Sequence, residues 1–71
     1  MQSRTPTRQR LISAAARRFQ RQGMAATGLN DVLADAGAPR GSLYHHFPGG
    51  KNELAAAAIR HSGQRISSVM E

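Results

Sequence analysis

The 71-residue sequence contains no cysteine, only four acidic residues and few aromatic ones. Without cysteine it can form neither a disulfide nor a thiolate metal site, which fits a reducing cytoplasm. It has no apolar run of about 18 residues or more, and its N-terminus lacks the apolar centre of a signal peptide. We therefore expect one small cytoplasmic domain that does not contact membranes.

The scarcity of acidic residues also argues against an enzyme. No Ser–His–Asp arrangement with supporting loops is present, and no glycine loop has the Walker or Rossmann spacing. His45, His46 and His61 are the candidate metal ligands. Adjacent histidines on a helix point about 100° apart, and His61 belongs to another expected helix, so they are not expected to share an ion. We expect no catalysis, no cofactor and no metal.

Positive charge is abundant, with ten Lys and Arg giving a net charge of +6. Six arginines precede the first acidic residue: Arg4, Arg8, Arg10, Arg17, Arg18 and Arg21. Such a surface favours a polyanionic partner, although a solvated arginine surface that serves solubility is the alternative. A general nucleic-acid or RNA binder would require more aromatic stacking platforms than one Tyr and two Phe. A basic amphipathic segment that acts on membranes or acidic proteins is disfavoured by glycine breaks near residues 23, 37 and 49, which indicate a compact bundle.

Apolar periodicity predicts an all-α fold. Thr5 and Pro6 open a helix over 5–22, and Gly23 ends it. A second helix is expected over 28–36, with Thr27 as its N-cap and Gly37 following it with positive φ. Their inward positions follow the 3.6-residue period: Leu11, Ile12, Ala15, Ala16 and Phe19 in the first helix, and Leu29, Val32, Leu33 and Ala36 in the second.

A third short helix is expected over 39–46, with Pro39 in its first turn. Pro39, Leu43 and Phe47 lie within about 40° of one line and should face inward. Gly41 and His45 then occupy the centre of the outward face, flanked by Ser42 and Tyr44, with Arg40 and His46 nearer the buried side. Two short helices joined by such a turn form a helix-turn-helix, whose second helix enters the major groove of DNA.

A fourth helix is expected over 51–70, after the turn Pro48-Gly49-Gly50. Lys51 at its start opposes the helix dipole, which suggests a phosphate partner there. Its apolar stripe is longer than a three-helix core can cover: Leu54, Ala55, Ala58, Ile59, Ser62, Ile66, Val69 and Met70. We therefore expect a DNA-binding domain over 1–50, with its motif at 28–47, and we expect 51–71 to be the start of a fourth helix in a fragment, or the ordered part, of a longer protein.

The run GLNDVLADAGAPRGSLYHHFPGGKNEL, together with ARRFQRQGMAATGL before it, resembles the DNA-binding core of the TetR family over Thr7 to Leu54. SLYHHF followed by a lysine is far more specific than a generic helix-turn-helix. PRGSLYHHFPGGK resembles the LmrA/YxaF-like branch, which carries two glycines before the lysine. Ala38 replaces the usual valine or isoleucine. Gly28 stands where Ser or Thr is commoner, and it lacks the hydroxyl with which relatives contact a phosphate.

The resemblance implies a ligand-released bacterial repressor that binds a palindromic operator as a homodimer. It also implies a C-terminal domain that dimerises and binds a small-molecule effector. From helix geometry, His45, Ser42 and Arg40 are the candidates for base contacts, and Gly41 permits close approach of the backbone. Tyr44, His46, Lys51 and the helix start at Thr27–Gly28 are assigned to phosphates, partly because matching positions in the family do this.

Overall fold

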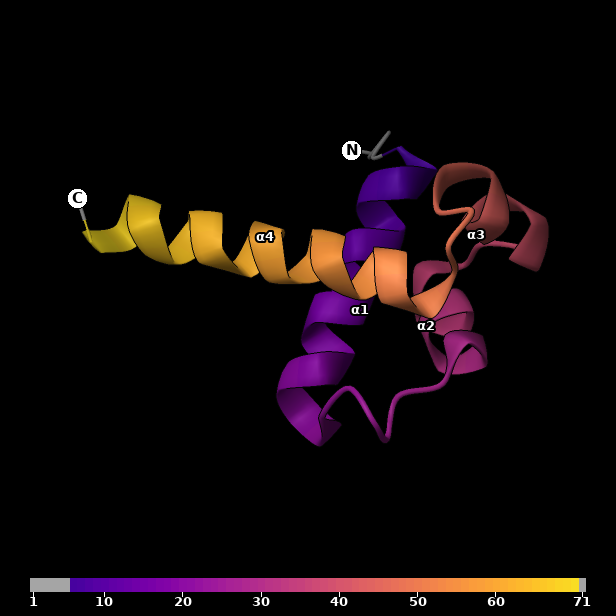
Figure 1. Cartoon of the computed structure of the whole chain (residues 1–71), viewed down its shortest axis with the longest axis horizontal. Coiled ribbons are helices and arrows are strands. Elements are labelled where there is room, and N and C mark those ends of the chain that lie inside the picture. The colour runs from indigo at the N-terminus through magenta and orange to yellow at the C-terminus, as the bar shows by residue number, and fades with distance from the viewer. Residues whose placement is uncertain (1–5, 71) are drawn as a thin grey trace.

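The computed structural model describes the backbone of residues 6–70 and the side chains of residues 6–62. The regular secondary structure of the described part is all helical, with α1 at Thr7–Gln22, α2 at Leu29–Ala36, α3 at Arg40–His46 and α4 at Lys51–Met70 (Figure 1). The all-α prediction is confirmed, and all four predicted C-terminal ends agree with the structure. None of the described helices is long and apolar enough to cross a membrane.

Three helices begin later than predicted, because the residues expected in or just before the first turn adopt extended backbone angles. Pro6 (φ −59°, ψ 151°) and Pro39 (φ −77°, ψ 158°) are N-caps, so α1 begins at Thr7 rather than residue 5 and α3 at Arg40 rather than 39. Proline fixes φ but leaves ψ free to be extended. Each proline carbonyl accepts a hydrogen bond from the first helical turn, from Arg10 N at 3.0 Å and from Ser42 N at 3.0 Å.

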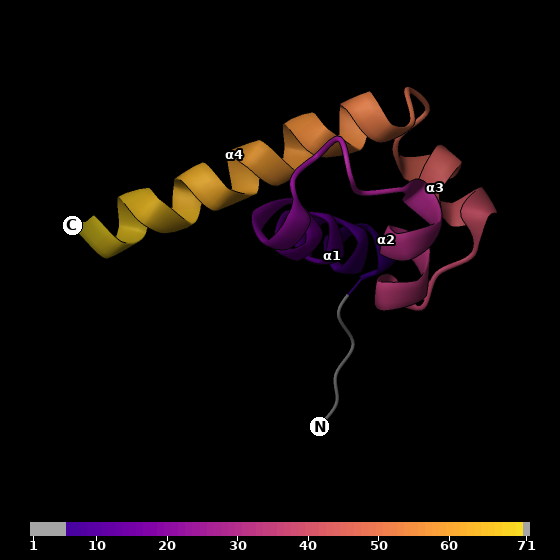
Figure 2. The same cartoon turned by 90° about the horizontal axis from the view of Figure 1, so that it is seen from below.

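The core lies where α1 packs against the other three helices. Figures 1 and 2 show α4 lying across α1 and then projecting beyond the bundle. Leucines, alanines and one phenylalanine dominate the buried cluster: Leu11, Ile12, Ala14, Ala15, Ala16, Val32, Leu33, Ala36, Leu43, Phe47, Leu54, Ala57 and Ala58. Phe19 and Leu29 are partly buried against it. The core is thus small, and alanine supplies most of what α4 contributes to it.

Two residues that were predicted to face inward do not. Pro39 is exposed because it precedes the helix that was expected to carry it. Ile59 is 66% exposed, since it lies about 140° around the helix from the buried Leu54. The predicted apolar positions Ile66, Val69 and Met70 lie outside the described side chains.

Candidate nucleic-acid interface

The turn between α2 and α3 is built on Gly37. This residue has φ 65° and ψ 38°, the left-handed region that was predicted for it. Its N–H donates to Ala34 O at 3.3 Å, and the next N–H, of Ala38, donates to Leu33 O at 3.1 Å. These bonds satisfy the last carbonyls of α2 and reverse the chain within three residues. The arrangement fixes the angle at which α3 leaves α2.

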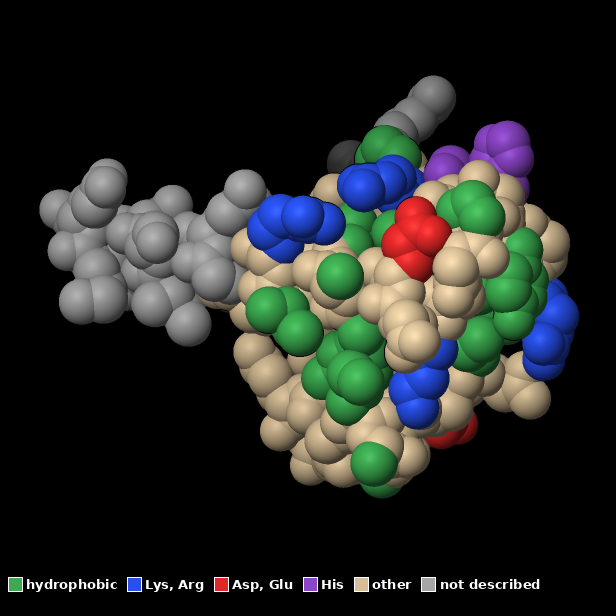
Figure 3. Space-filling model, in the orientation of Figure 1, with side chains coloured by type: hydrophobic (Ala, Val, Ile, Leu, Met, Phe, Trp, Pro, Cys, Tyr) green, Lys and Arg blue, Asp and Glu red, His purple; other side chains and the backbone are tan. Residues whose placement is uncertain are grey.

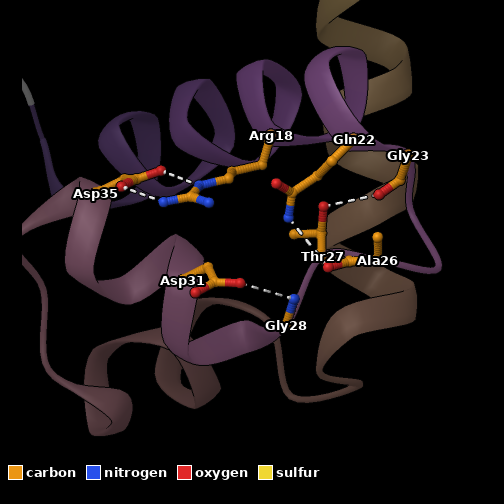
Figure 4. A network of polar contacts seen from close by, with 8 residues as sticks. All are labelled: Arg18, Gln22, Gly23, Ala26, Thr27, Gly28, Asp31 and Asp35. Atoms are coloured by element: carbon orange, nitrogen blue, oxygen red, sulfur yellow. Dashed lines mark hydrogen bonds and ion pairs between the residues drawn. The ribbon is translucent and has the colours of Figure 1, made fainter.

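The start of α2 differs from the prediction at Thr27. Its side chain is only 1% exposed, and its hydroxyl donates to Gly23 O at 2.8 Å (Figure 4). The N-cap is Gly28 instead, with φ −94° and ψ 155°, so α2 begins at Leu29 rather than 28. The Gly28 N–H donates to Asp31 Oδ2 at 3.4 Å. Thr27 therefore holds the preceding loop to the end of α1, and only backbone N–H groups of the first turn remain to bind a phosphate here.

Two further contacts fix this loop and α2 against α1 (Figure 4). Gln22 Nε2 donates to Ala26 O at 3.0 Å. Arg18 binds Asp35 through two hydrogen bonds, Nε to Oδ2 at 2.6 Å and Nη2 to Oδ1 at 3.1 Å. The hydrogen bonds and positive charge of Arg18 hold the pKa of Asp35 below its ordinary value. The same hydrogen bonds and the negative charge of Asp35 raise the pKa of Arg18. The first helix of the motif is thereby attached to α1 at both of its ends.

The Asp35→Asn variant should be less stable than the wild type at neutral pH. Because the pKa of Asp35 is lowered in the folded state, its contribution to the free energy of unfolding is present above the ordinary aspartate pKa. It is lost as the pH falls through the lowered pKa, so the two unfolding curves should converge in acid. Urea unfolding followed across the acid range measures this.

The matched controls are Arg18→Gln and the double variant. Arg18→Gln should lose the same contribution, and adding it to Asp35→Asn should cost little more, because both remove one interaction. The ion pair is partly exposed, at 25% and 31% for the two side chains, so the effect is modest. A stability difference that persisted unchanged into strong acid would contradict this role of the ion pair.

The orientation of α3 agrees with the prediction from helix geometry. Leu43 and Phe47 are 0% and 1% exposed and fix the inward face. The opposite side presents exposed Arg40, Gly41, Tyr44 and His45, with Ser42 and His46 half-buried at its margins. Figure 3 shows histidine side chains at the edge of the molecule over α3. The predicted base-reading positions are therefore open to a partner.

Gly41 has no neighbour within the described part of the chain that would exclude a side chain. A Cβ added there would meet no heavy atom within 4 Å. Glycine destabilises a helix interior by roughly 1 kcal/mol relative to alanine. Its presence on the exposed face is consistent with the expectation that the backbone approaches another molecule closely here.

The turn after α3 brings Tyr44 to the start of α4. Gly50 has φ 75°, and a Cβ there would lie 3.5 Å from Tyr44 Cε1 and 3.9 Å from its hydroxyl oxygen. Gly49 donates its N–H to Glu53 Oε1 at 2.7 Å, and a Cβ on it would lie 2.9 Å from that oxygen. Gly50 is therefore favoured by its positive φ, since a side chain there would make only ordinary contact with Tyr44, whereas at Gly49 a side chain would crowd Glu53. Half-buried Lys51 follows as the first residue of α4, as predicted, so Tyr44 and Lys51 lie at one junction.

Sequence reasoning missed two side chains that contact the two ends of the α3 segment. The Arg8 guanidinium lies 5.3 Å from the centroid of the Phe47 ring. Arg40 Nη2 donates to Asn30 Oδ1 at 2.8 Å. Arg8 was noted only as one of several early arginines, and no sequence signal singled out Asn30. Both contacts connect different helices, so they depend on how the helices pack.

The acidic residues of the described chain all bind partners within it. Asp31 accepts from Gly28 N, Asp35 from Arg18, and Glu53 from Gly49 N. The sequence from Pro39 to Gly50 contains no acidic residue. Figure 3 shows Lys and Arg side chains at several places on this face of the molecule, with an acidic side chain among them near its centre. The field around α3 therefore favours the approach of a polyanion.

This architecture and this surface define a helix-turn-helix domain that binds DNA. Residues 11–58 match the model of a family described as bacterial regulatory proteins, tetR family. The chain belongs to the TetR family, and it is the DNA-binding domain of a transcriptional regulator. The resemblance noted in the sequence is confirmed, and a regulator of this family is not an enzyme.

Curated relatives match nearly the whole chain. The uncharacterized HTH-type transcriptional regulator YxaF of Bacillus subtilis is 45% identical over 71 residues, which is 100% of this chain and 37% of YxaF. The HTH-type transcriptional regulator LmrA of the same organism is 48% identical over 69 residues, covering 92% of this chain and 37% of LmrA. TtgR of Pseudomonas putida is 43% identical over 53 residues, or 75% of this chain and 25% of TtgR. The chain thus spans little more than a third of YxaF and LmrA. No solved structure matches significantly.

Proposed function

We propose that this chain binds duplex DNA with sequence specificity as the DNA-reading part of a dimeric bacterial repressor. The observation that carries the proposal is the outward face of α3, where Arg40, Gly41, Tyr44 and His45 are exposed opposite the buried Leu43 and Phe47. Such a face fits the major groove, where Arg pairs with guanine through two hydrogen bonds. Arg40, Ser42 and His45 read bases, and Gly41 allows the backbone to lie close to them.

Phosphate contacts surround this face. Tyr44, His46 and Lys51 bind backbone phosphates near the junction of α3 and α4, and backbone N–H groups of the first turn of α2, which begins directly after Thr27 and Gly28, bind another. These contacts supply affinity and register, whereas the α3 side chains supply discrimination. The proposal places the protein in the cytoplasm, where the chromosome of a bacterium lies.

Dimer formation and release by a small molecule belong to the rest of a longer protein in this proposal. The curated relatives YxaF and LmrA are almost three times as long as the matched segment. Residues 1–50 form the DNA-reading domain, and α4 from residue 51 onward connects it to a domain that dimerises and binds the effector. Two copies related by a two-fold axis then read the two halves of a palindromic operator.

The primary test is selection of bound sequences from a random duplex pool. The expected result is enrichment of one short half-site. Titration against the enriched duplex, its single strands and anionic vesicles should show binding to the duplex alone at moderate salt. Equal affinity for single strands, or for vesicles, would overturn the proposal in favour of general nucleic-acid or membrane binding.

Lys51→Ala should weaken binding to all duplexes alike. Loss of one phosphate contact lowers the slope of log K against log salt by about one, without changing the preferred sequence. Fluorescence anisotropy at several salt concentrations measures both quantities. Arg21→Ala is the matched control, because it removes an exposed charge in the last turn of α1, far from α3 in Figure 1. A changed base preference with an unaltered salt slope would refute the phosphate assignment of Lys51.

A further inference from the structure

A contact between α2 and α3 involves the side chain assigned to guanine. Arg40 lies in the first turn of α3 and Asn30 in the first turn of α2, and both residues are exposed. Arg40 Nη2 donates to Asn30 Oδ1 at 2.8 Å. Elsewhere the two helices meet through buried apolar residues such as Val32, Leu33 and Leu43. The polar contact therefore adds nothing to the core, yet it restrains a long side chain on the DNA-facing side.

The contact leaves Arg40 able to recognise a base. A guanidinium has five N–H donors in a fixed plane, and Asn30 occupies one of them. The remaining donors still include a pair suited to the two acceptors on guanine. Because Asn30 is neutral, it orders the guanidinium without cancelling its positive charge, whereas a carboxylate at this position would compete with DNA for that charge. Restraint before binding reduces the entropy lost when Arg40 meets the base.

We propose that Asn30 is a positioning residue for base recognition, which holds the Arg40 guanidinium in the orientation that pairs with guanine. This inference rests on the proposed function and adds α2 to the parts of the chain that set sequence preference. Asn30 acts through Arg40, so its effect appears at the one base pair that Arg40 reads. The rest of the operator is read as before.

The test compares duplexes that differ at the base pair where Arg40→Ala relaxes preference. Asn30→Ala should reduce discrimination there by about three- to tenfold, the range set by the cost of ordering one long side chain. Its affinity for unrelated duplexes and its salt slope should stay at wild-type values. Asn30→Asp keeps the acceptor oxygen, but its carboxylate competes with DNA for the Arg40 guanidinium, so this variant should bind every duplex more weakly and should not recover wild-type discrimination. Circular dichroism and thermal unfolding should be unchanged in both variants, because the contact lies outside the core.

A double-mutant cycle separates positioning from direct contact. In an Arg40→Ala background, adding Asn30→Ala should change discrimination no further, since the group that Asn30 orients is absent. An equal loss in both backgrounds would mean that Asn30 contacts DNA itself, and the inference would be wrong. A selective wild-type chain with an unaffected Asn30→Ala variant would also overturn it. A wild-type chain with no base preference at all would instead overturn the proposed function.

Discussion

Replacing Phe47 with alanine is expected to remove a large part of the free energy of unfolding of this domain. Phe47 is 1% exposed and joins α3 to the core where α1 and α3 meet. Truncating a buried phenylalanine costs about 3–5 kcal/mol. A domain of this length has a total stability of roughly 4–10 kcal/mol. The substitution also removes the ring that lies beside the Arg8 guanidinium, so the loss in the free energy of unfolding should lie toward the upper part of the range for phenylalanine truncation.

Urea unfolding followed by circular dichroism measures the effect, and Tyr44→Ala is the control. Tyr44 lies three residues earlier on α3 and is 42% exposed, so its truncation should destabilise the fold far less while weakening DNA binding. DNA binding by Phe47→Ala should recover in part at low temperature or with excess operator, because ligand stabilises the folded state by mass action. A Phe47→Ala variant with wild-type stability would show that α3 is held by other contacts.

Arg40→Ala is expected to flatten the base preference at one position of the half-site. A bidentate arginine–guanine contact contributes about 1–3 kcal/mol of discrimination, or roughly 5- to 150-fold between the preferred and a wrong base. Affinity for unrelated duplexes should fall much less, by the effect of a single lost charge. Competition anisotropy with duplexes that carry each base pair at every half-site position measures this profile.

Lys51→Ala is the matched variant for this experiment, since it also removes one positive charge from the proposed interface. Arg40→Ala should change the relative affinities for duplexes that differ at one position, whereas Lys51→Ala should lower the affinity for every duplex by the same factor. Stability should be nearly unchanged in Arg40→Ala, because the side chain is exposed and its contact is with exposed Asn30. If both variants lowered the affinity for all duplexes equally, Arg40 would be a phosphate contact and its assignment to a base would be wrong.

Local pattern predicted most of the fold because helix formation depends on neighbours along the chain. The period of Val32, Leu33 and Ala36 identified α2, and the spacing of Leu43 and Phe47 fixed the inward face of α3. From that face alone, the exposure of Gly41 and His45 followed. The positive φ of Gly37 was predictable for the same reason, since the residue directly follows an amphipathic helix.

Cap positions were less predictable. Thr27 has a good capping side chain, but the loop folds back on α1 and uses its hydroxyl on Gly23 O. Pro6 and Pro39 fit the first turn or the cap equally well, because the ψ angle that decides between them is set by the incoming chain. Ile59 continued an apolar pattern in the sequence, but it lies on the side of α4 that points away from the buried Leu54.

Contacts between helices could not be derived from periodicity. Arg18 with Asp35, Arg8 with Phe47 and Arg40 with Asn30 each join residues separated by at least one helix boundary. Their partners depend on crossing angles that a single sequence does not specify. The same holds for the two glycines of the last turn: their spacing was visible, but their packing against Tyr44 and Glu53 was not.

The buried alanines where α1 packs on α4 have a consequence for specificity as well as for stability. Ala14, Ala15, Ala57 and Ala58 are buried in the core, so a larger residue at any of them is expected to move the two helices apart. Under the phosphate assignment proposed for Lys51, that displacement would move this residue relative to α3. In that proposal, buried alanine side chains that do not contact DNA set the spacing of the residues that do.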